Sequence, residues 1–155
     1  MTEILRILDQ LDRTFQGKAW HGPPLHELLK DVNARQANSK PPFASHCIWE
    51  IVLHIIAWQD VTRRRLGGET IIDLSPELDW PRISDGRETE WQRTINRLVE
   101  SKEKLRQRIS ELSDDRLEEI VPGKGYSVYV LLHGVIQHNL YHAGQIAILK
   151  KIPSS

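Results

Sequence analysis

Apolar residues recur every three or four positions along four long stretches of this chain, a spacing that places them on one face of an α-helix. The stretches cover residues 2–16, 46–66, 87–112 and 127–151. No part of the chain reads as a β-sheet. Because each apolar stripe has to be buried against other helices, the sequence predicts an all-α fold built from four long helices.

The breaks between these stretches indicate where the first two long helices begin and end. Gly17 ends the first one, and a shorter helix is expected over residues 25–32. Ser45 is a suitable N-cap for the second long helix. Gly67 and Gly68 stop that helix.

A long connection follows the second helix. The 20 residues 67–86 carry prolines and glycines without a helical period, so we expect them to connect two helices without forming one. A connection of this length suits the crossover of a four-helix bundle. We therefore predict a four-helix bundle with up-down-down-up connectivity and one long crossover.

Length, charge and cysteine content narrow the class of protein. The chain has 155 residues, with 21 Lys and Arg against 21 Asp and Glu, and we expect a single domain over residues 1–155. A formal net charge of zero disfavours nucleic acid and anionic membranes as partners. The longest apolar stretch, residues 51–58, is too short to span a bilayer. The single cysteine, Cys47, cannot form an internal disulfide and the N-terminus lacks a secretory pattern, so we expect a cytoplasmic protein. Cys47 itself is expected to be a buried inert thiol, too far along the helix from His54 to share its metal.

Three of the seven histidines fall on the core-facing stripes of two helices. His138 and His142 lie four residues apart on the apolar side of the last helix, so their Cβ atoms should be about 5–6 Å apart. His54 lies on the corresponding stripe of the second helix. Imidazoles from two helices are therefore expected to face the same interior.

Each of these imidazoles could simply be buried and hydrogen-bonded, which is the ordinary interpretation of a lone histidine on an apolar face. Three in one small core need a partner for every ring nitrogen, since each unsatisfied group costs about 1–3 kcal/mol. One metal ion satisfies three nitrogens at once, and facing helices of bundles are known to hold such sites. We therefore predict one divalent metal ion held by His54, His138 and His142.

Other residues are candidates for the surroundings of this site. Glu50 lies one turn before His54 and could orient its imidazole, with a surface glutamate as an equal alternative, and Gln145 has the same uncertain relation to His142. The remaining pocket candidates are aromatic or histidine residues on the second helix, the first loop and the crossover: Trp58, Trp20, His21 and Trp80.

The other histidines and a run of arginines receive no role in the site. His133 is expected to face away from it, His46 to be solvated or to cap a helix, and His26 cannot be placed. The run Arg63-Arg64-Arg65 precedes the end of the second helix, where positive charge is favourable, so solvation and the helix dipole explain it.

Two motifs carry a resemblance to a known family: His54 followed by Ile-Ile-Ala-Trp, and the run from His133 to Ile146 that contains His138 and His142. The chain resembles the DinB-like superfamily, particularly its YfiT-like branch. The resemblance extends over nearly the whole chain, including the Trp-His-Gly segment at 20–22 and the long crossover. It implies a four-helix bundle, commonly a homodimer, with a divalent metal held by the three histidines.

The resemblance leaves several functions open. The superfamily includes transferases and isomerases that use low-molecular-weight thiols such as bacillithiol or mycothiol, and members described as metal-dependent hydrolases. Three neutral ligands leave a coordination position open, which is typical of a catalytic site. A thiol there would be activated for attack on an electrophile, whereas water there would hydrolyse an amide or ester.

We favour thiol transfer to a small-molecule substrate, with zinc or nickel as the metal. The alternatives are a metal-dependent hydrolase and a non-catalytic, dimeric, metal-binding bundle. A second apolar face of the last helix could pack inside the bundle or against another subunit. This face comprises Tyr129, Ile136, Leu140 and Ala147.

Overall fold

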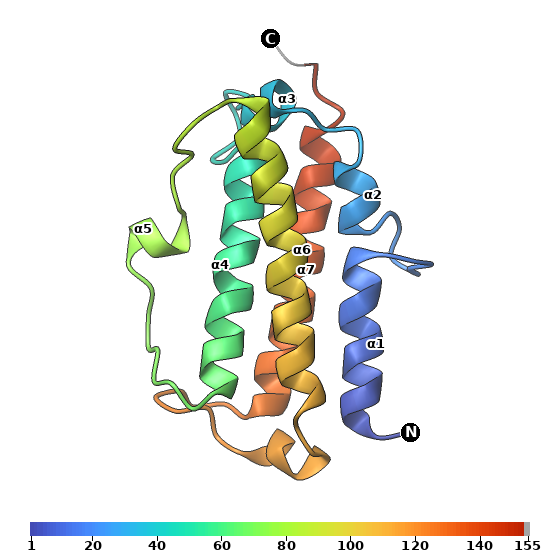
Figure 1. Cartoon of the computed structure of the whole chain (residues 1–155), viewed down its shortest axis with the longest axis vertical. Coiled ribbons are helices and arrows are strands. Elements are labelled where there is room, and N and C mark those ends of the chain that lie inside the picture. Colours follow the sequence, from blue (N-terminus) through green and yellow to red (C-terminus); the bar gives the residue numbers. More distant parts are fainter. Residues whose placement is uncertain (154–155) are drawn as a thin grey trace.

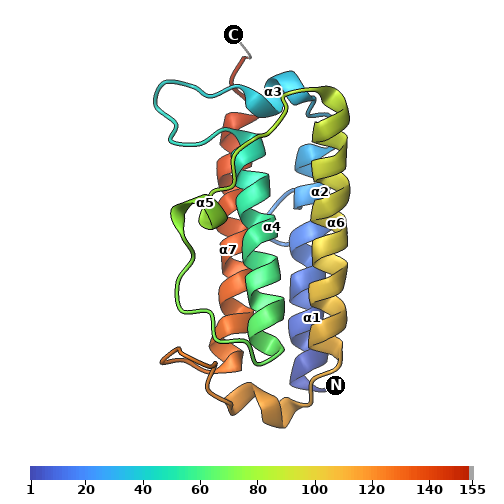
Figure 2. The same cartoon turned by 60° about the vertical axis from the view of Figure 1, so that its left-hand side comes forward.

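Four long helices form the body of the protein in a computed structural model that describes residues 1–153. They are α1 (Glu3–Phe15), α4 (Ile48–Leu66), α6 (Glu88–Ser110) and α7 (Val128–Leu149), packed side by side in Figures 1 and 2. The last two residues of the predicted domain lie outside the described residues. Within residues 1–153 the only β pairing is an isolated bridge between Ile120 and Ser127, so the all-α prediction is confirmed.

The remaining helices are short. They are α2 (Leu25–Leu29), α3 (Ala34–Asn38), α5 (Pro76–Asp79) and the 3₁₀ helix η1 (Asp114–Glu118). Figure 1 shows α1 and α7 rising toward the end of the bundle near α3, while α4 and α6 both descend from it. Because α4 and α6 run in the same direction, the chain between them has to return along the full length of the bundle. A search of the described residues finds no candidate membrane-spanning helix.

The start of α4 differs from the prediction that Ser45 caps it. The N-cap is Cys47, and the Oε2 of Glu50 accepts a hydrogen bond of 2.9 Å from the Cys47 backbone N–H. A glutamate three residues into a helix returns to the cap in this way in a capping box. The Glu50 position therefore decides where the helix begins.

The crossover also differs from the prediction that residues 67–86 form no helix. Residues Pro76–Asp79 form α5, with Ser75 at its N-cap. Proline suits the first helical position, because its fixed φ matches the helix and its missing N–H has no partner to lose there. Figure 2 shows α5 lying beside α4, halfway along the bundle. This single turn brings the crossover against the middle of α4.

Two apolar clusters fill the bundle interior. One includes Trp49 and Trp91 at the end near α3, and the other includes Leu105 and Leu132 at the end near η1. The buried polar residues include Lys102 of α6, whose Nζ lies 2.5 Å from Oδ1 of Asp12 in α1. The pairing compensates a charge that would otherwise be costly to bury.

Candidate metal centre

The imidazoles of His54, His138 and His142 meet between α4 and α7. The Nε2 of His138 lies 3.0 Å from the Nε2 of His54 and 3.1 Å from the Nε2 of His142. His54 and His142 are buried, and His138 is half-buried. The three residues form a group that could hold a metal ion. The predicted triad is thus brought together from two helices.

The outer nitrogens of two of these rings are fixed by carbonyl-type oxygens. The Nδ1 of His54 donates to the backbone carbonyl of Asp79 over 2.6 Å, and the Nδ1 of His142 donates to the Oε1 of Gln145 over 2.6 Å. An imidazole that carries its proton on Nδ1 has a free lone pair on Nε2. Both rings therefore present an acceptor to the centre of the group.

This arrangement fits a shared cation. A proton on the Nε2 of His138 could be donated to only one of the two neighbouring nitrogens, and the lone pair on the other Nε2 would be left without a donor. Nitrogen ligands 2.0–2.1 Å from a tetrahedral zinc ion would lie about 3.3 Å from each other, close to the two separations observed. The donor set also suits a divalent ion, since imidazole binds zinc, nickel, copper and iron.

Burial keeps the three rings in the neutral form that binds metal. Loss of solvation, together with the neighbouring His142 and His54, lowers the pKa of His138 to about 3. Loss of solvation is also the main cause that lowers the pKa of His54 and that of His142. The ligands therefore need no deprotonation at neutral pH.

Trp80 of the crossover closes one side of the centre. Its indole stacks on His54 at 3.9 Å between ring centroids and on His46 at 3.4 Å, with both planes nearly parallel. The preceding Asp79 accepts a hydrogen bond of 2.7 Å from the Nε1 of Trp58 through its side chain. Two consecutive residues of the crossover are thus held against α4, and through them the orientation of His54 is set.

A cavity of about 490 Å³ opens beside the three histidines. Its walls are mainly apolar and come from α4, α7, the segment before α7 and Asp79 of the crossover. They include Trp58, Leu131, Val135 and Tyr141. The site is therefore a group of histidines that could hold a metal ion, at the wall of a cavity large enough for a small molecule.

Comparison with models of protein families identifies the family of this chain. The model of the DinB superfamily matches residues 20–146, a region that holds all three histidines. The chain belongs to the DinB superfamily. No curated protein and no solved structure matches it. The resemblance inferred from the two histidine motifs is confirmed at the level of the superfamily, and membership of this superfamily is consistent with a metal-associated helical protein.

Some of the residues proposed to surround the site contact it, and others do not. Gln145 contacts His142 as considered, and Trp58 lines the cavity. Glu50 does not contact His54: its carboxylate caps α4 and lies 3.6 Å from the Nδ1 of His46. Asp79 takes the orienting role instead.

Trp20 and His21 do not reach the centre. Trp20 is fully exposed, and both residues line a separate hollow beside α1 and α7 together with Ile136 and Leu140. The loop that carries them follows α1, which lies on the other side of α7 from the crossover. Their prediction as pocket residues of the metal site is wrong.

The other unassigned side chains also have clear positions. His46 stacks on Trp80, although solvent or a capping role was expected, and His133 packs against Tyr129 at 4.3 Å between ring centroids. Cys47 is buried, and burial raises the pKa of its thiol, in agreement with the inert role predicted for it.

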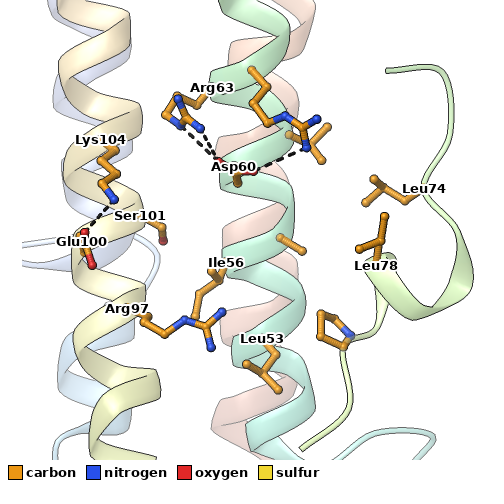
Figure 3. A pocket seen from close by; sticks show the side chains of 14 residues that line it. Leu53, Ile56, Asp60, Arg63, Leu74, Leu78, Arg97, Glu100, Ser101 and Lys104 are labelled. Carbon is orange, nitrogen blue, oxygen red and sulfur yellow. Dashed lines mark hydrogen bonds and ion pairs between the residues drawn. The ribbon is translucent and has the colours of Figure 1, made fainter. Parts of the chain in front are cut away.

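A second cavity of about 340 Å³ lies on another face of α4, between α6 and the crossover (Figure 3). Figure 3 shows Leu74 and Leu78 of the crossover pointing toward α4. The acidic groups here are already paired, since Asp60 contacts Arg63 at 2.7 Å and Glu100 contacts Lys104 at 2.7 Å. Among the described residues this cavity brings together no group of metal ligands, so it is not the candidate centre.

Gln145 provides a test of how the centre is oriented. Replacing Gln145 by Ala removes the acceptor for the His142 Nδ1–H, and we expect the affinity for zinc to fall by about 10- to 100-fold. Competition with a chromogenic chelator would measure the affinity. Gln137→Ala, an exposed glutamine on the same helix, is the matched control. Equal affinity in both variants would show that the hydrogen bond has no part in metal binding.

The low pKa values predict how the metal-free protein responds to acid. Below pH 6.5 these histidines are protonated in the unfolded chain but stay neutral in the folded protein, because folding lowers their pKa. The free energy of unfolding should therefore fall as pH decreases from 7 to 5. His138 alone should contribute about 1–2 kcal/mol to this fall. Chemical denaturation of chelator-treated protein would measure it. The fall should be smaller in His138→Leu and unchanged in a variant of the exposed His26; an identical fall in all three proteins would contradict the assignment.

Proposed function

We propose that this protein is a divalent-metal-dependent transferase that activates a low-molecular-weight thiol for attack on an electrophilic small molecule. The observation that carries the proposal is the convergence of three neutral imidazole nitrogens on one point at the wall of an apolar cavity. Zinc or nickel is the proposed metal. Three protein ligands leave a further position for a ligand that enters from the cavity.

The charged groups around the cavity favour a thiol over water as the nucleophile. The only carboxylate among the described lining residues is Asp79, and its Oδ1 already accepts from Trp58 and lies 3.2 Å from the Nδ1 of His54. Hydrolysis commonly uses a free general base to position and deprotonate water. A thiol has a much lower intrinsic pKa and can ionise without such a base.

The reaction proposed is a simple displacement. When bound, the metal favours the deprotonated form of the thiol at its open position. The sulfur then forms a bond to the electrophilic carbon, and the leaving group departs from that carbon with its electron pair. The thiol proton goes to solvent. Trp58, Leu131 and Val135 supply apolar walls that limit the access of water to the reacting atoms.

A direct assay separates thiol transfer from hydrolysis. Zinc- or nickel-loaded protein should convert a thiol and 1-chloro-2,4-dinitrobenzene to the thioether and chloride, at a rate well above that of the thiol alone. The His138→Ala, His142→Ala double variant should lose both the rate enhancement and the bound metal. His26→Ala, which changes an exposed histidine, is the control for both measurements.

Three outcomes would contradict the proposal. Turnover of amide or ester substrates without consumption of thiol would identify a hydrolase. Metal binding without either activity would leave a metal-binding bundle without catalysis. Equal metal content in the wild type and the double histidine variant would show that His138 and His142 do not hold the metal.

We also propose that the protein is a homodimer through an exposed face of α7. Of the face named in the sequence analysis, Ile136 is buried and Leu140 and Ala147 pack against the core clusters, so these three serve the bundle interior, whereas Tyr129 is exposed. The apolar side chains that α7 leaves exposed include Val130, Tyr141 and Ile148. Val130 and Tyr141 also line the cavity, so a partner on this face would help to cover it.

Light scattering tests the dimer. At micromolar concentration we expect twice the chain mass of 18.0 kDa for the wild type. A Tyr141→Glu substitution should shift the protein to the monomer, because it places a charge in the contact. The control is Val99→Glu, an exposed apolar residue on α6. A clean wild-type monomer would remove the dimer proposal.

A further inference from the structure

Arg65 is a buried arginine at the wall of the cavity that holds the three histidines. The sequence analysis places it in a solvated run with Arg63 and Arg64, but Arg65 is only 4% exposed. Arg63 and Arg64 pair with Asp60, whereas Arg65 appears in none of the ion pairs found among residues 1–153. The solvated interpretation is therefore wrong for Arg65, which keeps its charge inside the protein without a carboxylate partner.

The hydrogen bonds of Arg65 all go to uncharged oxygens. Its Nε donates to the carbonyl of Ile71, and its Nη2 donates to the carbonyls of Ile71 and Ile72. Its Nη1 donates to the hydroxyl of Tyr126 over 3.1 Å. A guanidinium has five N–H groups, so one N–H on Nη1 is left over. The location in the last turn of α4 favours a cation but supplies no formal negative charge.

Tyr126 adds a second unused donor at the same place. Its hydroxyl accepts the hydrogen bond from Arg65, which leaves the phenolic O–H free to donate. Both Arg65 and Tyr126 line the cavity. A spare N–H and a spare O–H side by side suit the two oxygens of a carboxylate, and a charge-assisted pair with arginine is among the stronger hydrogen-bonded contacts.

The distance from the histidines fits the two ends of one ligand. The indole of Trp58 lies between them, 6.3 Å from the ring of His54 and 5.7 Å from the Cζ of Arg65. The guanidinium is therefore within about 12 Å of the His54 ring, along the same wall of the cavity. A small molecule could occupy the metal position with one end and reach Arg65 with the other.

We infer that Arg65 and Tyr126 form an anion subsite that binds a carboxylate of the small-molecule ligand, in the same cavity as the three histidines. The inference rests on the proposed function for which end of the ligand reacts at the metal. It narrows the ligand class to molecules in which an apolar spacer joins that end to a carboxylate. The subsite itself is formed by this chain's side chains and exists without the metal.

Octanoate and 1-octanol provide matched probes, because they share an apolar tail and differ in the charged group. Isothermal titration calorimetry on chelator-treated, metal-free protein should show octanoate binding at least about tenfold more tightly than 1-octanol. In Arg65→Met this preference should disappear while 1-octanol binding is retained. Arg63→Met, which changes an arginine two residues away that already pairs with Asp60, should keep the preference.

Tyr126→Phe keeps the result interpretable if Arg65→Met fails to fold, since Arg65 also holds the carbonyls of Ile71 and Ile72. This variant leaves those contacts in place and removes one donor, so the preference for octanoate should fall by severalfold. Equal affinity for the two probes in the wild type, no octanoate binding, or an undiminished preference in either variant would show that Arg65 only braces the crossover. The titration needs neither metal nor turnover. It can therefore contradict the anion subsite while the proposed thiol transfer stands, and the transfer assay can fail while the anion subsite stands.

Discussion

The hydrogen bond between the Nδ1 of His54 and the backbone carbonyl of Asp79 joins the two parts of the molecule on which the candidate site depends. On one side it fixes the crossover against the middle of α4. On the other it places the proton of His54 on Nδ1, so that Nε2 turns an acceptor toward His138 and His142. Because the acceptor is a backbone carbonyl of the crossover and the carboxylate of the same Asp79 lies 3.2 Å from this nitrogen, the path of the crossover sets the ring orientation. The stacking of Trp80 on the same imidazole strengthens this control.

The bundle supports this centre by dividing its interior. Apolar clusters at the two ends provide the burial that holds the four helices together, and a few polar side chains are buried beside them. Three neutral imidazoles, a buried arginine and a buried lysine are costly in such an interior unless they are paired. Lys102 has its partner in Asp12. The imidazoles and Arg65 instead face a cavity, which is where a metal ion and an anionic ligand would complete them.

Much of this could be predicted from the sequence, because the relevant signals are local and periodic. The helical spacing of apolar residues gave the four long helices, and the separation of four residues between His138 and His142 placed both on one face. Asp79 and Trp80 were harder to assign, since their contacts with α4 depend on how a 20-residue connection folds back. The Ser75-Pro76 pair was the one available sign that this connection contains a helical turn.

Sequence spacing on a helix does not show what lies opposite a residue. For this reason the solvated interpretation of Arg65 is wrong, and of the two roles considered for Glu50 the orienting one is not found. The structure puts the carbonyls of the crossover against Arg65 and the free N–H of Cys47 against Glu50. Trp20 and His21 were misplaced because nothing in a loop sequence specifies which side of the bundle it covers.

X-ray absorption spectroscopy of the zinc-loaded protein tests the central claim most directly. If the three histidines hold the ion and leave one position open, the spectrum should show three imidazole nitrogens at about 2.0–2.1 Å and one oxygen ligand from water. When a thiol is added, a sulfur at about 2.3 Å should replace that oxygen. A spectrum with fewer than three imidazoles, or one in which added thiol brings no sulfur to the metal, would contradict the account.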